Sequence, residues 1–234
     1  MSKIPLINTR PAKDKSVRSA KARASADRAA PPRPSKRTVG ATERRAAIVA
    51  AGLDEFTAKG FAATRLDDVA RRAGVAKGTI YLHFKDKEAL FQELVRTALG
   101  PLIVRIANPV IGSGSARAAI EALAETFARE VIGTRRADIV RMIISEGTRF
   151  PQLADFYYRE VVAHGVAGMR KLIEYGIARG EIRNAGLADF PQLLVAPMMV
   201  AVIWQGLFGK HAPLDVAAML RVHLDLIFDE GRAT

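Results

Sequence analysis

The chain has 234 residues, a formal net charge of +12 and no cysteine. This length corresponds to one or two domains, and the lack of cysteine excludes a disulfide framework and a cysteine-based zinc site. No apolar run reaches the roughly 18 residues of a membrane span, and the first residues lack the apolar core of a signal peptide. We therefore expect a soluble, cytoplasmic protein with no membrane partner.

The excess positive charge is concentrated near the N-terminus. Residues 1–40 contain eleven Lys and Arg against two Asp and Glu, several prolines and no aromatic residue. Such a segment buries too little apolar surface to offset the entropy lost on ordering, so we expect a disordered basic arm over residues 1–40. It is either a solvated tail without function or a cationic arm that adds salt-dependent attraction to nucleic acid.

A helical pattern begins after this arm and continues along the chain. Thr42 is placed to cap a first helix, and Gly60 is placed to end it. Other segments with helical spacing are bounded by glycine, proline and asparagine, and no stretch alternates as a strand would. The sequence therefore predicts an all-α fold, with later helices near residues 117–132, 136–149, 152–179, 189–208 and 214–229.

The most informative segment, residues 61–94, predicts a helix-turn-helix. Thr64 can cap a short helix, and Gly74 permits the left-handed turn that ends it. A second short helix follows from Lys77 to Phe84, with Ile80 and Phe84 facing inward. Two short helices joined by a tight glycine turn place the second helix in the DNA major groove.

The second helix and its surroundings carry the groups expected to contact DNA. Lysine reaches phosphates or guanine edges, and tyrosine, histidine and threonine offer hydrogen bonds to the backbone. Tyr81 is alternatively a packing aromatic, and His83 an ordinary surface histidine. The predicted DNA-binding residues are Thr64, Lys77, Gly78, Thr79, Tyr81, His83 and Lys85.

The run GVAKGTIYLHFKDKEALF, residues 74–91, resembles the signature of the TetR/AcrR family of bacterial transcriptional repressors. The similarity extends upstream through Thr64 and Gly60, and it departs from the family pattern at Ala76, where a hydroxyl residue often caps the recognition helix. The resemblance implies a small three-helix DNA-binding domain at residues 41–100. A larger helical domain for effector binding and dimerisation is expected at residues 101–234.

The resemblance further implies a homodimer that binds double-stranded operator DNA and is released by a small-molecule effector. Residues 141–156 resemble the regulatory domains of a subset of the family. We expect a largely apolar effector to enter near this segment and to shift the helix that follows Phe84. The candidate ligand-binding residues are Phe127, Arg141, Met142, Glu146, Phe150, Phe156, Met169, Met198 and Trp204.

Arg141 and Glu146 are the polar groups expected in that pocket. The alternative is an ordinary apolar core with these two residues paired at the surface.

The last two predicted helices each carry an apolar stripe. Two such helices from each subunit would form a four-helix bundle around a two-fold axis, although the same stripes could serve only the internal core. The predicted interface residues are Leu193, Val200, Ala201, Trp204, Phe208, Val216, Met219, Leu220, His223 and Ile227.

These features predict a sequence-specific DNA-binding repressor. The alternatives are a nonspecific or architectural nucleic-acid-binding protein driven by the basic arm, and a protein-interaction module that does not bind DNA. The four histidines show no metal-site spacing, and the sequence around Gly112 lacks the lysine of a phosphate loop. We therefore expect no enzymatic activity, no metal and no cofactor.

Overall fold

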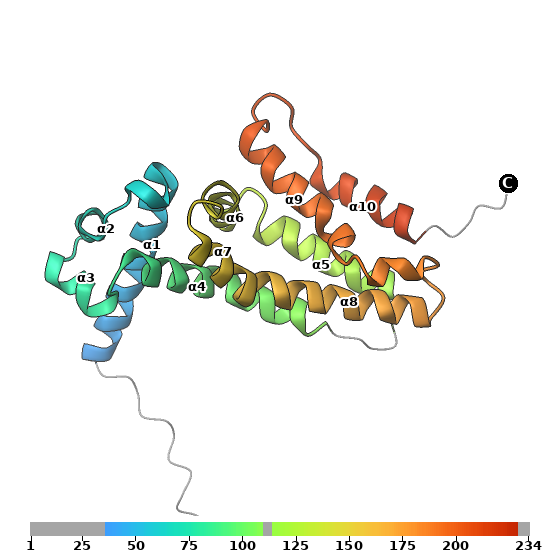
Figure 1. Cartoon of the computed structure of the whole chain (residues 1–234), viewed down its shortest axis with the longest axis horizontal. Helices are drawn as coiled ribbons and strands as arrows, with labels where there is room; N and C mark the ends of the chain where they lie inside the picture. Colours follow the sequence, from blue (N-terminus) through green and yellow to red (C-terminus); the bar gives the residue numbers. More distant parts are fainter. Residues whose placement is uncertain (1–35, 110–113, 229–234) are drawn as a thin grey trace, which may run out of the picture. The chain divides into compact units, whose positions relative to one another are not determined.

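The computed structural model describes residues 36–109 and 114–228, and these residues form helices joined by turns (Figure 1). This confirms the predicted all-α fold. Contacts divide the chain into two units, residues 1–41 and 42–234, and the second unit contains the described helices apart from the start of the first one. Within the described ranges, no helix is both long and apolar enough to cross a membrane.

The first helix, α1, spans Lys36–Ala63, so it starts earlier than predicted. Thr42 lies inside α1, and the prediction that it caps the helix is wrong. The last five residues of the predicted arm, 36–40, are helical as well, since the final proline of the arm, Pro34, precedes them. The remainder of the arm, residues 1–35, lies outside the described residues.

Gly60 breaks α1 as predicted, with a φ of 76° and a ψ of 167°, a region that is accessible almost only to glycine. The prediction that Thr64 caps the next helix is wrong. Its buried hydroxyl donates a 2.8 Å hydrogen bond back to the carbonyl of Gly60. The next helix is preceded by Arg65, which provides no side-chain cap.

The helix-turn-helix consists of α2 (Leu66–Arg72) and α3 (Lys77–His83). Gly74 between them has a φ of +67°, so the predicted left-handed turn is confirmed. Ala76 precedes α3 without a side-chain cap, as expected. Apolar side chains from both helices are buried with those of α1, in a core that includes Ile48, Phe56, Phe61, Leu66, Val69, Ile80 and Phe84.

Helix α4 spans Lys87–Ala107 without interruption. The predicted domain boundary at residues 100/101 therefore falls inside a helix. Asp86 caps its start, accepting a 2.7 Å hydrogen bond from the backbone amide of Ala89. Leu90 and Phe91 near its start belong to the core around α1, whereas Leu102 belongs to a second core with α5, α6, α9 and α10 residues. The same helix thus contributes to both parts of the molecule.

The remaining helices match the five predicted segments closely. They are α5 (Ala116–Glu130), α6 (Arg135–Glu146), α7 (Pro151–Tyr157), the π-helical turn η1 (Tyr158–Val162), α8 (Ala163–Ala178), the short 3₁₀ turn η2 (Ala185–Ala188), α9 (Gln192–Leu207) and α10 (Val216–Ile227). The predicted helix at 152–179 is divided because the π-helical turn separates α7 from α8. Ser115, Thr134 and Asp215 cap α5, α6 and α10 with their side chains.

Candidate DNA-binding face and effector cavity

The outward face of α3 is open to solvent. Gly78, Lys77 and Tyr81 are exposed, and Thr79 and His83 are partly buried. Leu82, which was not among the predicted DNA-binding residues, is 85% exposed. Because α3 buries Ile80 toward the core, the periodicity alone indicates that Leu82 faces outward, although leucine is usually assigned to a core.

An acidic residue of α2 contacts this face. The carboxylate of Asp67 lies 2.7 Å from Nζ of Lys77 and accepts a 3.3 Å hydrogen bond from the hydroxyl of Tyr81. The ammonium group of Lys77 is the main cause that lowers the pKa of Asp67, and the hydrogen bond with Asp67 raises the pKa of Lys77. Asp67 therefore fixes two of the predicted DNA-binding side chains next to each other.

The two lysines after α3 differ in their surroundings. The side chain of Lys85 is highly exposed, and its ion pair with Asp86 is long at 3.7 Å. Lys87 instead donates hydrogen bonds of 2.8 and 2.9 Å to the carbonyls of Phe61 and Ala62. Lys87 thus secures the end of α1, while Lys85 is available to a ligand.

The larger domain contains an apolar cavity of about 450 Å³, walled by α4, α5, α6, the end of α7, η1, α8 and α9. Three of the predicted ligand-binding residues, Phe127, Met169 and Met198, line it. Apart from Tyr157 and Gln192, its lining consists of apolar side chains and one glycine. The C-terminal half of α4 contributes Leu99, Leu102, Ile103 and Ile106 to the wall.

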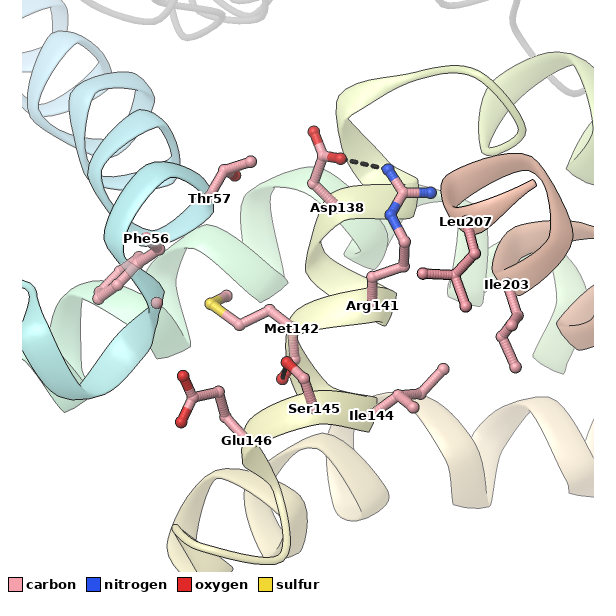
Figure 2. Close-up of a pocket in the computed structure, with 11 residues that line it drawn as sticks. Phe56, Thr57, Asp138, Arg141, Met142, Ile144, Ser145, Glu146, Ile203 and Leu207 are labelled. Atoms are coloured by element: carbon pink, nitrogen blue, oxygen red, sulfur yellow. Dashed lines mark hydrogen bonds and ion pairs between the residues drawn. The ribbon is translucent and has the colours of Figure 1, made fainter. Parts of the chain in front are cut away.

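Three other predicted ligand-binding residues lie elsewhere. Arg141, Met142 and Glu146 line a separate pocket of about 390 Å³ between α1, α6 and α9 (Figure 2). Arg141 pairs there with Asp138 and donates a 3.3 Å hydrogen bond to the carbonyl of Val202. Arg141 therefore does not pair with Glu146, which was the alternative for these two residues.

The last three predicted ligand-binding residues do not line the large cavity either. Phe156 is buried in the core around α1, and Phe150 packs edge-on against Phe61 with ring centroids 5.0 Å apart. Trp204 lies on the outer side of α9, where its indole donates a 2.8 Å hydrogen bond to the carbonyl of Ala212. The nine candidates thus occupy different sites, because helical spacing does not reveal which of two apolar faces a cavity adjoins.

The outer faces of α9 and α10 expose several apolar side chains. Four predicted interface residues are among them, namely Leu193, Val200, Trp204 and Phe208. Four further exposed apolar residues were not predicted from the sequence, namely Ile203, Leu207, Val222 and Leu226. The prediction that Ala201, Val216 and Leu220 face a second subunit is wrong, because they are buried in the core of their own chain. Met219 and Ile227 are partly buried against the same chain.

His223 also lies on α10, and its Nε2 is buried without a hydrogen-bond partner among the described residues. Burial lowers the pKa of this imidazole from the usual 6.5, and it outweighs an opposing contribution from the backbone of Leu193. The neutral form is therefore favoured in the folded chain.

The sequence matches two regions characteristic of one group of regulators. Residues 48–94 match the bacterial regulatory proteins of the tetR family, and residues 110–223 match the tetracyclin repressor-like C-terminal domain. The first match contains the helix-turn-helix, and the second contains α5 to α9 and part of α10.

A curated relative and two solved structures support the same assignment. The HTH-type transcriptional repressor KstR2 of Rhodococcus jostii is 33% identical over 206 residues, which cover 85% of this chain and 96% of the relative. The Bacillus subtilis regulator FadR in complex with stearoyl-CoA is 20% identical with a TM-score of 0.60, covering 78% of this chain and 97% of that one. A Saccharomonospora viridis regulator in complex with choline is 21% identical with a TM-score of 0.64, covering 81% and 97%.

At these identities the two structures establish the fold, and the relatives named here are regulators. The nonspecific nucleic-acid-binding alternative is not favoured. The chain belongs to the tetR family of bacterial regulatory proteins, and it is a helix-turn-helix, DNA-binding transcriptional repressor.

Proposed function

We propose that the chain acts as a homodimer that binds its operator through α3 and dissociates when a largely apolar effector enters the cavity between α4 and α9. The observation that carries this proposal is the continuity of α4. Its first turns belong to the core beneath the helix-turn-helix, and its last turns line the cavity. A ligand that moves the C-terminal half of α4 would therefore also shift the core that supports α3.

The groups proposed to contact DNA are the exposed ones on and after α3. Lys85 and Lys77 are placed for phosphates, Tyr81 for a phosphate or the groove wall, and Leu82 for a thymine methyl group. Gly78, Thr79 and His83 remain proposed contacts. Thr64 is withdrawn because its side chain is buried and its hydroxyl is bonded to Gly60.

Substitution of single residues tests the DNA-binding face. Lys85→Ala should weaken binding to all DNA sequences and reduce the slope of log K against log salt by about 1, as expected for the loss of one phosphate contact. Lys210→Ala, which removes an exposed lysine in the turn after α9, is the matched control and should change neither quantity. Equal effects of the two substitutions would contradict the assignment.

The effector is proposed to be apolar because the cavity walls are apolar. The fold neighbours include one complex with stearoyl-CoA and one with choline, which supports a role of this domain in binding small molecules. A ligand weakens operator binding only if it prefers the arrangement that does not bind DNA. A coupling free energy of about 1–3 kcal/mol corresponds to roughly 5- to 150-fold release.

A thermal-shift screen with lipophilic compounds, followed by operator-release assays on the hits, tests this step. A stabilising compound that fills the cavity without loosening the operator complex would contradict induction by that compound.

The exposed apolar side chains of α9 and α10 are proposed to form the dimer interface. Reading of two half-sites by α3 requires two copies related by a two-fold axis. The protein would act on the chromosome in the cytoplasm, as a regulator and not as an enzyme.

A further inference from the structure

We propose that Tyr157 is the hydrogen-bond donor that selects the effector, and that the effector is a neutral, largely apolar molecule with one hydrogen-bond acceptor placed against this phenol. The inference rests on the proposed function, because it assumes that the effector occupies the cavity between α4 and α9. It adds the chemical class of the effector and the residue that recognises it.

The composition of the cavity wall excludes a charged group in its interior. None of the residues that line it carries a charge, and Tyr157 and Gln192 are its two polar side chains. Gln192 is the first residue of α9 and is exposed to solvent. An ionic group moved into this cavity would lose its hydration without gaining a counter-ion, which is strongly unfavourable.

The phenol of Tyr157 is available to a ligand. Within residues 36–109 and 114–228, no group forms a hydrogen bond with its hydroxyl, and the residue lines the cavity. Burial raises its pKa to about 12. The hydroxyl therefore stays protonated at physiological pH and can donate a hydrogen bond to an acceptor placed against it.

The helix changes from α-helical to π-helical directly after Tyr157. Tyr157 ends α7 and is followed directly by the π-helical turn η1, whose Val161 and Val162 also line the cavity. Single π-helical turns within α-helices occur frequently at functional sites. The next residue, Tyr158, is 60% exposed and does not line the cavity, so two adjacent tyrosines have different surroundings.

These two tyrosines provide a matched pair of variants. Tyr157→Phe removes only the proposed donor, and Tyr158→Phe removes an equivalent hydroxyl at the surface. The probes are 2-dodecanone, dodecane, dodecanoate and dodecyltrimethylammonium, which share one chain length and differ in their polar group. Binding is measured by calorimetric titration of the full-length protein, and operator affinity without probe reports that each variant is folded.

We expect wild-type protein to bind the ketone more tightly than the hydrocarbon and than either ion. Tyr157→Phe should weaken ketone binding about 2- to 12-fold, the effect of one hydrogen bond, and leave dodecane binding unchanged. Tyr158→Phe should have no effect on either probe.

The inference is overturned if Tyr157→Phe leaves ketone affinity unchanged, if an ionic probe binds best, or if neither neutral probe binds. One further result would contradict the proposed function but not the recognition of a ligand by Tyr157. If the ketone binds in a Tyr157-dependent manner but does not change operator affinity at saturation, Tyr157 recognises a ligand that is not an effector.

Discussion

Asp67 on α2 competes with DNA phosphate for two side chains of the recognition helix α3. Asp67 holds both Lys77 and Tyr81, and its lowered pKa keeps the carboxylate charged. A DNA phosphate that approaches these side chains must displace an anion of the same sign. Asp67 therefore orients the two side chains in the free protein, and we expect it to weaken binding to random DNA.

Replacement of this carboxylate gives a directional prediction. Asp67→Asn should raise affinity for random DNA more than affinity for the operator and should steepen the salt dependence by about 1, since Lys77 is freed to bind a phosphate. Asp155→Asn, which neutralises an exposed carboxylate on α7, is the control. Fluorescence anisotropy titrations at several salt concentrations measure both effects, and an unchanged slope for Asp67→Asn would rule out the competition.

The exposed apolar face of α9 and α10 is the proposed dimer interface. Val200→Asp places a charge on the exposed apolar face, so we expect sedimentation equilibrium to show monomers with unchanged helical content. Val104→Asp, at an exposed apolar position on α4, should leave the dimer intact. Ala201→Asp would instead place a charge in the core of one chain and should unfold it. A dimeric Val200→Asp variant would place the interface elsewhere.

The free energy of unfolding should depend on pH because of His223 on α10. Its pKa is lowered by burial in the folded state, so the unfolded chain takes up a proton at a higher pH than the folded chain. The free energy of unfolding should therefore fall as the pH is lowered through the ordinary histidine value of 6.5.

Urea unfolding of wild type and His223→Gln between pH 7.5 and 5.5 measures this decrease. We expect the substitution to flatten it and His211→Gln, at an exposed position, to preserve it. Identical pH profiles for wild type and His223→Gln would show that other groups cause the decrease.

Among the structural elements, the helix-turn-helix could be predicted from the sequence and the cavity could not. The helix-turn-helix is predictable because its signals are local, as Gly74 requires one turn and Ile80 and Phe84 select one buried face. The cavity is not, because it depends on how distant helices pack. The neighbours Phe156 and Tyr157 are both aromatic and both contact the core around α1, yet Tyr157 alone also lines the cavity. Val200 and Ala201 differ in the same way between surface and core.

Charge on the whole molecule is distributed unevenly. Residues 1–35 contain nine Lys and Arg against two Asp and Glu, and a cationic segment contributes sequence-independent, salt-dependent affinity. If it acts as an arm, its deletion should reduce the salt slope of DNA binding while the preference for the operator over random DNA is retained. An unchanged slope in the same titrations would assign these residues no role in binding.

We expect the whole dimer to read a specific DNA sequence through α3. The most direct measurement is a competition titration at physiological salt, in which DNA from beside its own gene competes with shuffled DNA of the same composition. We expect the genomic fragment to bind at least about 10³-fold more tightly, and Tyr81→Ala combined with Lys85→Ala to remove most of this preference. Equal affinity for both DNAs would contradict the account.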